Sequence, residues 1–299
     1  MLLQQLITFC TVVDEGGFTR AAELLDMSQP AVSKQVKTLE ERIGTPLFVR
    51  AGRRVALTPA GEIVYAHAKR ILHAIEEMHG ALAALAVPGS GRLFIGAVPT
   101  VAVFTLPDIL GAFCKRHPLV TVHVRTGDID EVVQMVLRSE IDVGLVTIPV
   151  THELLETIPL FRDRIVLVAR PDTPWAQRQA VQPAELAGMP MIAYERASKF
   201  RRYVDASFDA AGITPDVIME FDSHEAVKAM VLAGLGVAMM PWSVVARDLE
   251  QGRLVELRIE RFGELARTTS LIVRRGRHLS APVRAFLDLV REKYPLAPA

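Results

Sequence analysis

The stretch DMSQPAVSKQVKTLEERIGTPLFVRAGRR, Asp26–Arg54, contains the pattern that decides the fold of the N-terminal part of this chain. Ser28 is an N-cap residue, and Pro30 falls in the first helical turn, where its missing N–H costs no hydrogen bond. The apolar residues that follow are four, three and four positions apart and form one helical stripe: Val32, Val36, Leu39 and Ile43. The opposite stripe is polar and consists of Gln29, Ser33 and Lys37, with Lys34 beside it. The pattern predicts a helix with one buried face and one face of mostly short polar side chains.

The residues before this helix predict two further short helices. Apolar residues recur at helical spacing from Leu3 to Val13 and stop at Gly16 and Gly17. Thr19 is then the expected N-cap of a helix over Arg20–Leu25. Two short helices, a tight turn and a helix with a polar outer face are typical of a helix-turn-helix. The alternative is a solvated surface helix, which usually carries long Glu and Lys pairs instead of Gln and Ser.

The segment after this helix predicts a small β-wing. PLFVRAGRRVALTPAG, Pro46–Gly61, alternates apolar residues around a basic tip that holds Arg50, Gly52, Arg53 and Arg54. Between Ser28 and Thr58, six Lys and Arg residues face two Glu residues, a local charge of +4. Basic side chains of this kind neutralise DNA phosphates.

Composition limits the remaining possibilities. The 299 residues are 50% hydrophobic, and 34 Lys and Arg balance 34 Asp and Glu, so the whole chain has no net charge to attract nucleic acid. Cys10 and Cys114 lie in apolar helical contexts without metal-ligand spacing, and we expect buried, reduced thiols, with a disulfide as the alternative. No cationic leader is visible, and the uncharged run Leu93–Pro107 is too short to cross a bilayer. We expect a soluble cytoplasmic protein without a membrane partner.

A long helix is predicted from Pro59 onward. Its apolar residues alternate at spacings of four and three over three heptads, which predicts a helix–helix dimer. The predicted seam consists of Val64, Ala68, Ile71, Ile75, Met78, Leu82 and Leu85. The alternative is packing of this helix on its own domain. Three histidines, His67, His73 and His79, are six residues apart and point in different directions, so no metal site is expected.

Strand and helix patterns alternate after VPGSGR, Val87–Arg92, which predicts a joint. Strands are expected at Leu93–Val98, Val120–Arg125, Asp142–Thr147, Ile165–Ala169, Met191–Tyr194, Val217–Phe221, Val237–Met240 and Ser270–Val273. Helices are expected at Thr100–Lys115, Ile129–Arg138, Lys199–Ala211, His224–Ala233 and Ala281–Lys293. Two βαβαβ runs predict two α/β lobes with parallel sheets covered on both faces, joined by two crossing segments. The last helix is expected to return to the first lobe, and ligands to bind between the lobes.

The motifs together resemble a known family. FTRAAELLDMSQPAVSKQVKTLEERIGTPLFVRAGRRVALTPAG, Phe18–Gly61, is similar to the N-terminal signature of LysR-type transcriptional regulators in its AA, SQPAVS, LE, G, LF, R and LT-x-AG elements. VLAGLGVAMMP, Val231–Pro241, resembles the pattern of the family's second lobe. The resemblance implies an α/β protein with an all-α-type head: a winged helix-turn-helix at 1–58, a dimerisation helix at 59–86 and a periplasmic-binding-protein-like effector domain at 87–299. Lobe 1 would comprise 91–162 and 268–299, and lobe 2 would comprise 163–267.

The resemblance also implies partners and DNA-binding residues. Promoter DNA would be bound by the recognition-helix residues Ser28, Gln29, Pro30, Ser33, Lys34 and Lys37 and by the wing residues Arg50, Arg53 and Arg54. Gln29 would pair with adenine edges, Ser33 with a base edge or a phosphate, and the basic residues mainly with phosphates. The family implies a homodimer or homotetramer and raises RNA polymerase as a further candidate partner.

For the effector, the resemblance implies residues at the ends of several strands: Pro99, Thr100, Val101, Gly127, Asp128, Thr147, Arg196, Ser198, Lys199 and Phe200. Helix N-termini at Thr100 and Ser198, with the charges of Arg196 and Lys199, favour an organic acid. Asp128 counts against this assignment.

Two other functions are weighed. An enzyme is disfavoured because the chain lacks a G-x-S-x-G elbow, a phosphate loop and HExxH, and Met239 replaces the third glycine of a dinucleotide motif. No cofactor or metal is expected. A solute-binding protein is disfavoured by the specificity of the N-terminal motif.

Overall fold

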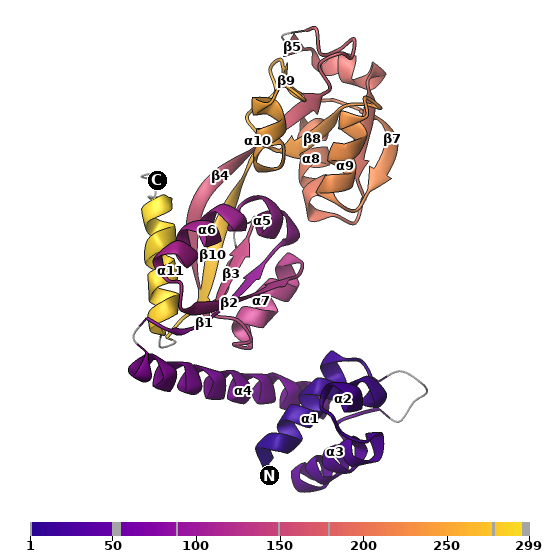
Figure 1. The fold of residues 1–299 in the computed structure, drawn as a ribbon. Helices are drawn as coiled ribbons and strands as arrows, with labels where there is room; N and C mark the ends of the chain where they lie inside the picture. The colour runs from indigo at the N-terminus through magenta and orange to yellow at the C-terminus, as the bar shows by residue number, and fades with distance from the viewer. Residues whose placement is uncertain are drawn as a thin grey trace.

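The computed structural model describes residues 2–49, 55–87, 89–148, 150–178, 180–276 and 279–294. A helical head, one long helix and two α/β lobes follow one another along the chain, and the C-terminal helix lies against the first lobe (Figure 1). The two-lobed α/β architecture with a helical head is the predicted fold class.

The head is built from three helices, α1 (Leu2–Asp14), α2 (Phe18–Leu24) and α3 (Gln29–Ile43). Ser28 is the N-cap of α3, as predicted, and its hydroxyl accepts a hydrogen bond from the Ala31 N–H. Gly44 ends α3 with a φ of 83°, a left-handed conformation that glycine adopts without strain. The second helix begins at Phe18 with Gly17 as its N-cap, so the prediction that Thr19 caps it is wrong.

The predicted wing is only partly described. Phe48 and Leu57 form an antiparallel bridge where the two arms of the wing leave the head. The tip of the wing, with Arg50, Arg53 and Arg54, lies outside the described residues. The Glu40 carboxylate on α3 accepts hydrogen bonds from the backbone N–H groups of Leu47 and Phe48, at 2.7 and 3.3 Å. This carboxylate therefore fixes the first arm of the wing against α3.

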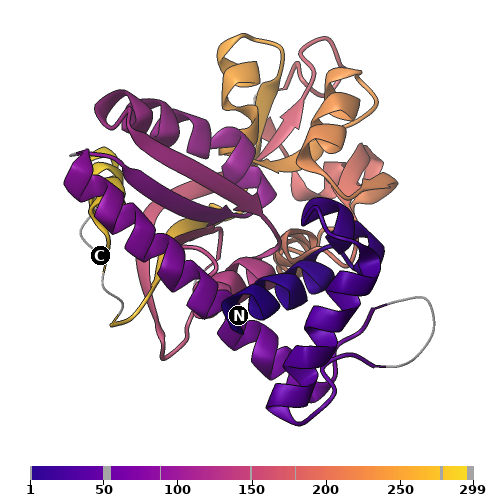
Figure 2. The ribbon, with the colours of Figure 1, turned by 60° about the horizontal axis from the view of Figure 1, so that its bottom comes forward.

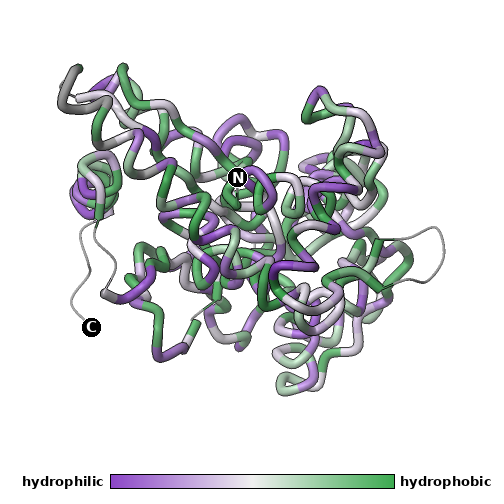
Figure 3. The backbone as a smooth tube through the Cα atoms, turned by 90° about the horizontal axis from the view of Figure 1, so that it is seen from below, coloured by the Kyte–Doolittle hydropathy of each residue, from purple (hydrophilic) through white to green (hydrophobic). Residues whose placement is uncertain are grey.

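The long helix α4 (Pro59–Ala86) connects the head to the first lobe and runs along the side of that lobe (Figure 2). His73 lies at this contact, buried, with its Nε2 3.3 Å from Asp142 Oδ1 and its ring against Phe94. A buried pair of this kind holds α4 on lobe 1. Seen from below, hydrophobic and hydrophilic residues alternate along the chain (Figure 3).

Two residues of the predicted dimer seam pack in the core of their own subunit. Ala68 is buried and Val64 half-buried in the core of the head, which corrects their assignment to the seam. Ile71, Met78 and Leu82 are exposed by 47%, 51% and 56%, and Ile75 is half-buried. The side chain of Leu85 lies outside what the structure describes. An apolar strip of α4 thus remains uncovered beyond the head.

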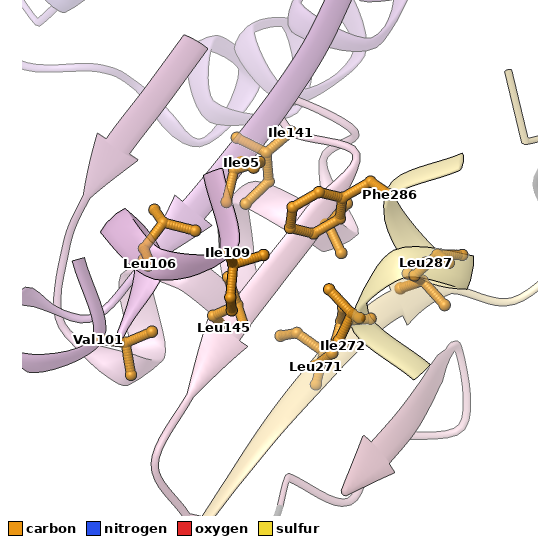
Figure 4. Packing of buried hydrophobic residues seen from close by; sticks show 14 of the residues in the cluster. Ile95, Val101, Leu106, Ile109, Ile141, Leu145, Leu271, Ile272, Phe286 and Leu287 are labelled. Atoms are coloured by element: carbon orange, nitrogen blue, oxygen red, sulfur yellow. The ribbon is translucent and has the colours of Figure 1, made fainter. Parts of the chain in front are cut away.

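Lobe 1 is a mixed sheet in the order β2-β1-β3-β10-β4. The strands β1 (Gly91–Ala97), β2 (Val120–Thr126) and β3 (Val143–Val146) are parallel, whereas β10 (Ala266–Arg274) and the first half of β4 (Leu155–Ala169) run antiparallel. Helices α5 (Pro99–Phe104), α6 (Leu106–Arg116), α7 (Ile129–Leu137) and α11 (Ala281–Lys293) pack on it. Ile95, Ile109, Leu145, Ile272 and Phe286 meet in its core (Figure 4).

Three predictions for lobe 1 need correction. The expected helix Thr100–Lys115 is two helices, because Pro107 has no N–H to continue the first one past Thr105. Cys114 on α6 is exposed, although Cys10 is buried as predicted and burial raises the pKa of its thiol to about 12. The strand β2 is largely exposed, so this edge of the sheet is not covered on both faces.

Lobe 2 contains the parallel strands β6 (Pro190–Tyr194) and β7 (Asp216–Phe221), joined through β8 (Ala238–Pro241) to the second half of β4. Its helices are α8 (Lys199–Ala210), α9 (His224–Leu232) and α10 (Trp242–Glu250). The sequence patterns missed α10, the strands β5 (Ala180–Val181) and β9 (Val255–Ile259), and the 3₁₀ helix Pro183–Gly188. The strands β4 and β10 pair across the junction and form the hinge between the lobes (Figure 1).

Candidate DNA-binding surface and interlobe cleft

The outer face of α3 is the first candidate site. Val32, Val36 and Leu39 are buried in the head, and this orientation turns the opposite stripe outward. Gln29, Pro30, Lys34 and Lys37 are exposed, together with Ser28, and Ser33 is half-buried between them. The predicted recognition-helix residues therefore share one surface.

The polar side chains on this face are available for a partner. The Gln29 Nε2 group donates to Ser33 Oγ at 2.9 Å, an exposed contact that a base edge can replace. Lys37 lies 3.9 Å from Glu41, and both side chains are more than 60% exposed, so this pair contributes little to stability. A row of short polar groups with two lysines beside it has the chemistry of a base-reading helix with phosphate contacts.

A cavity of about 650 Å³ between the two lobes is the second candidate site. Lobe 1 contributes Val98, Thr100, Asp128, Ile129, Thr147 and Ile148; lobe 2 contributes Glu195, Ala197, Ser198, Lys199, Phe200, Arg202, Tyr203, Asp222 and His224; the hinge contributes Arg267. The hydroxyl-bearing residues Thr100 and Thr147 are buried and follow the carboxyl ends of β1 and β3. The loops at the ends of parallel strands thus meet at this cavity, as such folds require.

Six of the predicted effector residues line this cavity: Thr100, Asp128, Thr147, Ser198, Lys199 and Phe200. The other four are not among the lining residues. Val101 is buried in the core of lobe 1, and Arg196 is 86% exposed and pairs with Glu220 at 3.6 Å. Pro99 is exposed at the start of α5, and Gly127 lies just before the lining residue Asp128.

The charged residues that were predicted to select the ligand are already engaged. Lys199 of lobe 2 forms an ion pair with Asp130 of lobe 1, with Nζ 2.8 Å from the carboxylate. Asp128 is the N-cap of α7 and accepts from the Glu131 N–H at 2.9 Å. Lys199 therefore links the two lobes, and the Asp128 carboxylate is held by its own helix.

Two residues that line the cavity, His224 and Arg267, were not predicted from the sequence. His224 Nδ1 lies 2.5 Å from the Tyr194 hydroxyl, and burial lowers the pKa of His224 to about 3, with a smaller contribution from Arg267. The imidazole is therefore neutral near pH 7. Burial also raises the pKa of Tyr194, which keeps its hydroxyl a donor.

Arg267 is the second missed residue. Its side chain is 8% exposed, its Nη2 lies 3.1 Å from Asp163 Oδ2, and its guanidinium lies 5.6 Å from the centre of the Phe200 ring. Burial lowers the pKa of this guanidinium, and the nearby Asp163 carboxylate opposes that effect.

Only one of these two residues could have been identified from the sequence. His224 opens the helix that follows a predicted parallel strand, which is a position where ligands bind, so its place was readable from the sequence. Arg267 precedes the predicted strand Ser270–Val273, and no local pattern shows that it pairs with a residue 104 positions away.

Comparisons with known proteins cover both parts of the chain. Residues 3–62 match the sequence model of the family described as "Bacterial regulatory helix-turn-helix protein, lysR family", and residues 87–295 match "LysR substrate binding domain". A helix-turn-helix head joined to a two-lobed ligand-binding domain defines a ligand-responsive transcriptional regulator. The chain belongs to the LysR family of transcriptional regulators.

Individual relatives match over nearly the whole chain. The RuBisCO operon transcriptional regulator of Allochromatium vinosum is 34% identical over 96% of this chain and 95% of the relative. A probable RuBisCO transcriptional regulator of Cyanophora paradoxa is 32% identical over 98% of this chain and 92% of the relative.

Solved structures show the same architecture. Full-length CbnR in complex with its target DNA matches with a TM-score of 0.72 and 26% identity over 98% of this chain and 99% of that chain. The regulatory domain of Synechocystis PCC6803 CcmR in complex with 2-PG matches with a TM-score of 0.60 and 24% identity, covering 70% of this chain and 99% of that domain, and shows the shared fold alone.

Within the part of the chain that the structure describes, no group of three or more His, Cys, Asp and Glu side chains is placed to hold a metal ion. In the same part of the chain, no helix has the length and apolar character needed to cross a membrane.

Proposed function

We propose that α3 reads promoter DNA in the major groove while an organic anion bound between the lobes controls that binding. The observation that carries the proposal is the orientation of α3, whose apolar stripe is buried in the head and whose polar stripe faces outward. The similarity to CbnR in complex with its target DNA supports the same role. Gln29 and Ser33 contact base edges, and Lys34, Lys37 and the wing arginines Arg50, Arg53 and Arg54 contact phosphates. Ser28 and Pro30 fix the start of α3.

The assembly proposed for this regulator is a homodimer or a dimer of dimers. The surface assigned to subunit contact is the exposed apolar strip of α4, Ile71, Met78 and Leu82, with the half-buried Ile75 between them. Leu85 keeps its predicted place in the seam. Head, α4 and effector domain correspond to 1–58, 59–86 and 87–299, with lobe 1 at 91–162 and 268–299 and lobe 2 at 163–267.

Movement of the lobes about β4 and β10 changes the spacing of the paired heads and hence the half-sites they reach. The protein acts in the cytoplasm by binding, without catalysis, and RNA polymerase is its candidate protein partner.

An anionic effector is supported by donors that converge on the cavity. The Ser198 hydroxyl lies at the start of α8, and it makes no capping hydrogen bond to that helix. Thr100 and Thr147 add hydroxyls from lobe 1, and Arg267 adds a cation. Lys199 contributes less than expected, since its charge is neutralised by Asp130.

The effector assignment is tested with the full-length protein and a panel of 2-PG, small carboxylates, aromatic acids, amino acids and sugar phosphates. A member at a hundredfold over its Kd is expected to stabilise the fold by about 2.7 kcal/mol in thermal unfolding and to change affinity for operator DNA. Thr147→Val removes a hydroxyl from the cavity and is expected to abolish the shift without changing DNA affinity in the absence of ligand.

The exposed Thr121 on β2 provides the matched control. Thr121→Val should keep the full response. If no carboxylate or phosphate member of the panel stabilises the protein, the anionic effector is excluded.

A further inference from the structure

We infer that Arg267 is the residue that anchors the anionic group of the effector, and that Asp163 competes with the effector for it. This inference rests on the proposed function, because it names the chemistry of recognition in the same cavity. The group recognised is an oxyanion, either a carboxylate or a phosphate.

The position of Arg267 is set by the hinge. Arg267 on β10 and Asp163 on β4 are directly paired across the two antiparallel strands that join the lobes. Residues paired in this way present their side chains on the same face of the sheet. Arg267 therefore lies where both lobes meet, and any movement of the lobes passes through the strands that carry it.

The hydrogen bonds of Arg267 leave one end of its guanidinium unused. Nε and Nη2 both donate to Asp163 Oδ2, at 3.2 and 3.1 Å. Within the described ranges, Nη1 has no hydrogen-bond acceptor, although the side chain is only 8% exposed and lines the cavity. Nη1 is not one of the fully buried atoms that lack a partner, so it is open to the solvent of the cavity, where an oxyanion can accept a charge-assisted hydrogen bond from it.

Asp163 does not depend on Arg267 alone. Its Oδ1 accepts from the Ser243 backbone N–H at 3.0 Å, and its Oδ2 accepts from the Ser243 hydroxyl at 2.7 Å. These donors at the start of α10 remain when the guanidinium turns toward a ligand. Asp163 can therefore lose a hydrogen bond from Arg267 without being left unpaired in the protein interior.

The neighbours of Arg267 complete an anion site. His224 is neutral and uses Nδ1 toward the Tyr194 hydroxyl, which has no other partner among the residues that the structure describes. When that hydroxyl donates to Nδ1, the proton of the ring is on Nε2, and the imidazole is a donor without negative charge. The carboxylates of Glu195 and Asp222 line the exposed part of the same cavity. They oppose an anion there and direct it toward the buried end with Arg267.

Because Asp163 competes with the ligand for Arg267, removing the charge of Asp163 is expected to raise the affinity for the ligand. Asp163→Asn removes the competing charge but keeps a side chain of the same shape, so the affinity for an oxyanion is expected to rise by about tenfold or more, an amount typical of one charge-assisted hydrogen bond. In the double variant Asp163→Asn/Arg267→Gln, no charge is left buried without a partner, and this gain is expected to be lost. The control is Asp248→Asn. Asp248 is another buried carboxylate, 3% exposed and paired with Lys228 and Arg253. Its replacement is expected to leave oxyanion affinity unchanged.

The experiment is calorimetric titration of full-length wild type and variants with inorganic phosphate and, separately, with acetate. A gain in D163N that disappears in the double variant supports the anchor, and the probe that shows the larger gain identifies the group as phosphate or carboxylate. The anchor is overturned if D163N binds neither probe more tightly than wild type, or if the double variant keeps the gain. Operator affinity measured with saturating probe tests the proposed function separately: binding at Arg267 with no ligand effect on DNA would contradict the regulation and leave the anchor standing.

Discussion

Replacing both Ile71 and Leu82 by aspartate is expected to convert the assembled regulator into monomers and to lower its affinity for an operator by about a hundredfold or more. These side chains are 47% and 56% exposed within the subunit, on the strip of α4 that the head leaves uncovered. Two aspartates would place charges in an apolar subunit contact. A monomer binds one half-site and loses the gain of two linked heads, which is typically 10²–10⁴ in affinity. Light scattering measures the assembly, and fluorescence anisotropy measures operator binding.

The control for this prediction is Leu154→Asp, which places the same charge at an apolar residue 46% exposed in lobe 1, away from α4. It should leave assembly and operator affinity unchanged. Dimers that persist in the Ile71/Leu82 variant would show that the subunits meet elsewhere.

Truncating Phe286 to alanine is expected to destabilise the effector domain by about 3–5 kcal/mol, the usual cost of deleting a buried aromatic ring. Phe286 on α11 is fully buried in the core of lobe 1 (Figure 4). Its ring centre lies 5.5 Å from that of Phe113 on α6. The contact attaches the C-terminal helix to lobe 1, which carries Thr100 and Thr147. The midpoint of urea unfolding, monitored with the full-length protein, should fall strongly.

Arg291→Ala provides the comparison on the same helix. Arg291 is 55% exposed and pairs only weakly with Asp288 at 3.8 Å, so its loss should change the midpoint by little. Equal midpoints for the Phe286 and Arg291 variants would mean that α11 does not contribute to the core of lobe 1.

The parts of the fold that depend on local sequence could be predicted. Ser28, Pro30 and the spacing of Val32, Val36 and Leu39 define α3 without any distant contact, and the structure places its start at the predicted residue. Thr100 and Thr147 follow apolar strands, and the rule that ligands bind at the carboxyl ends of such strands locates them in the cavity.

The parts of the fold and of the site that depend on contacts between distant residues could not be predicted. The heptad pattern of α4 shows that Val64 and Ala68 are buried, but it does not distinguish the subunit's own head from a second subunit. Arg196 and Lys199 look alike in sequence, yet Lys199 lines the cavity and Arg196 is solvated, because α8 begins only at Lys199. Arg267 gains its importance from a strand pairing that the sequence pattern does not reveal.

The direct test of DNA reading by α3 is base preference, measured by selecting operator sites from randomised DNA with wild type and with Gln29→Ala. Discrimination at one position in each half-site is expected to fall by about 1–3 kcal/mol, because one base-contacting side chain is lost. Lys37→Ala should instead weaken binding to all sequences and reduce the dependence on salt by about one counterion. An unchanged base preference at every position in the Gln29 variant would contradict the claim that the outer face of α3 reads the DNA.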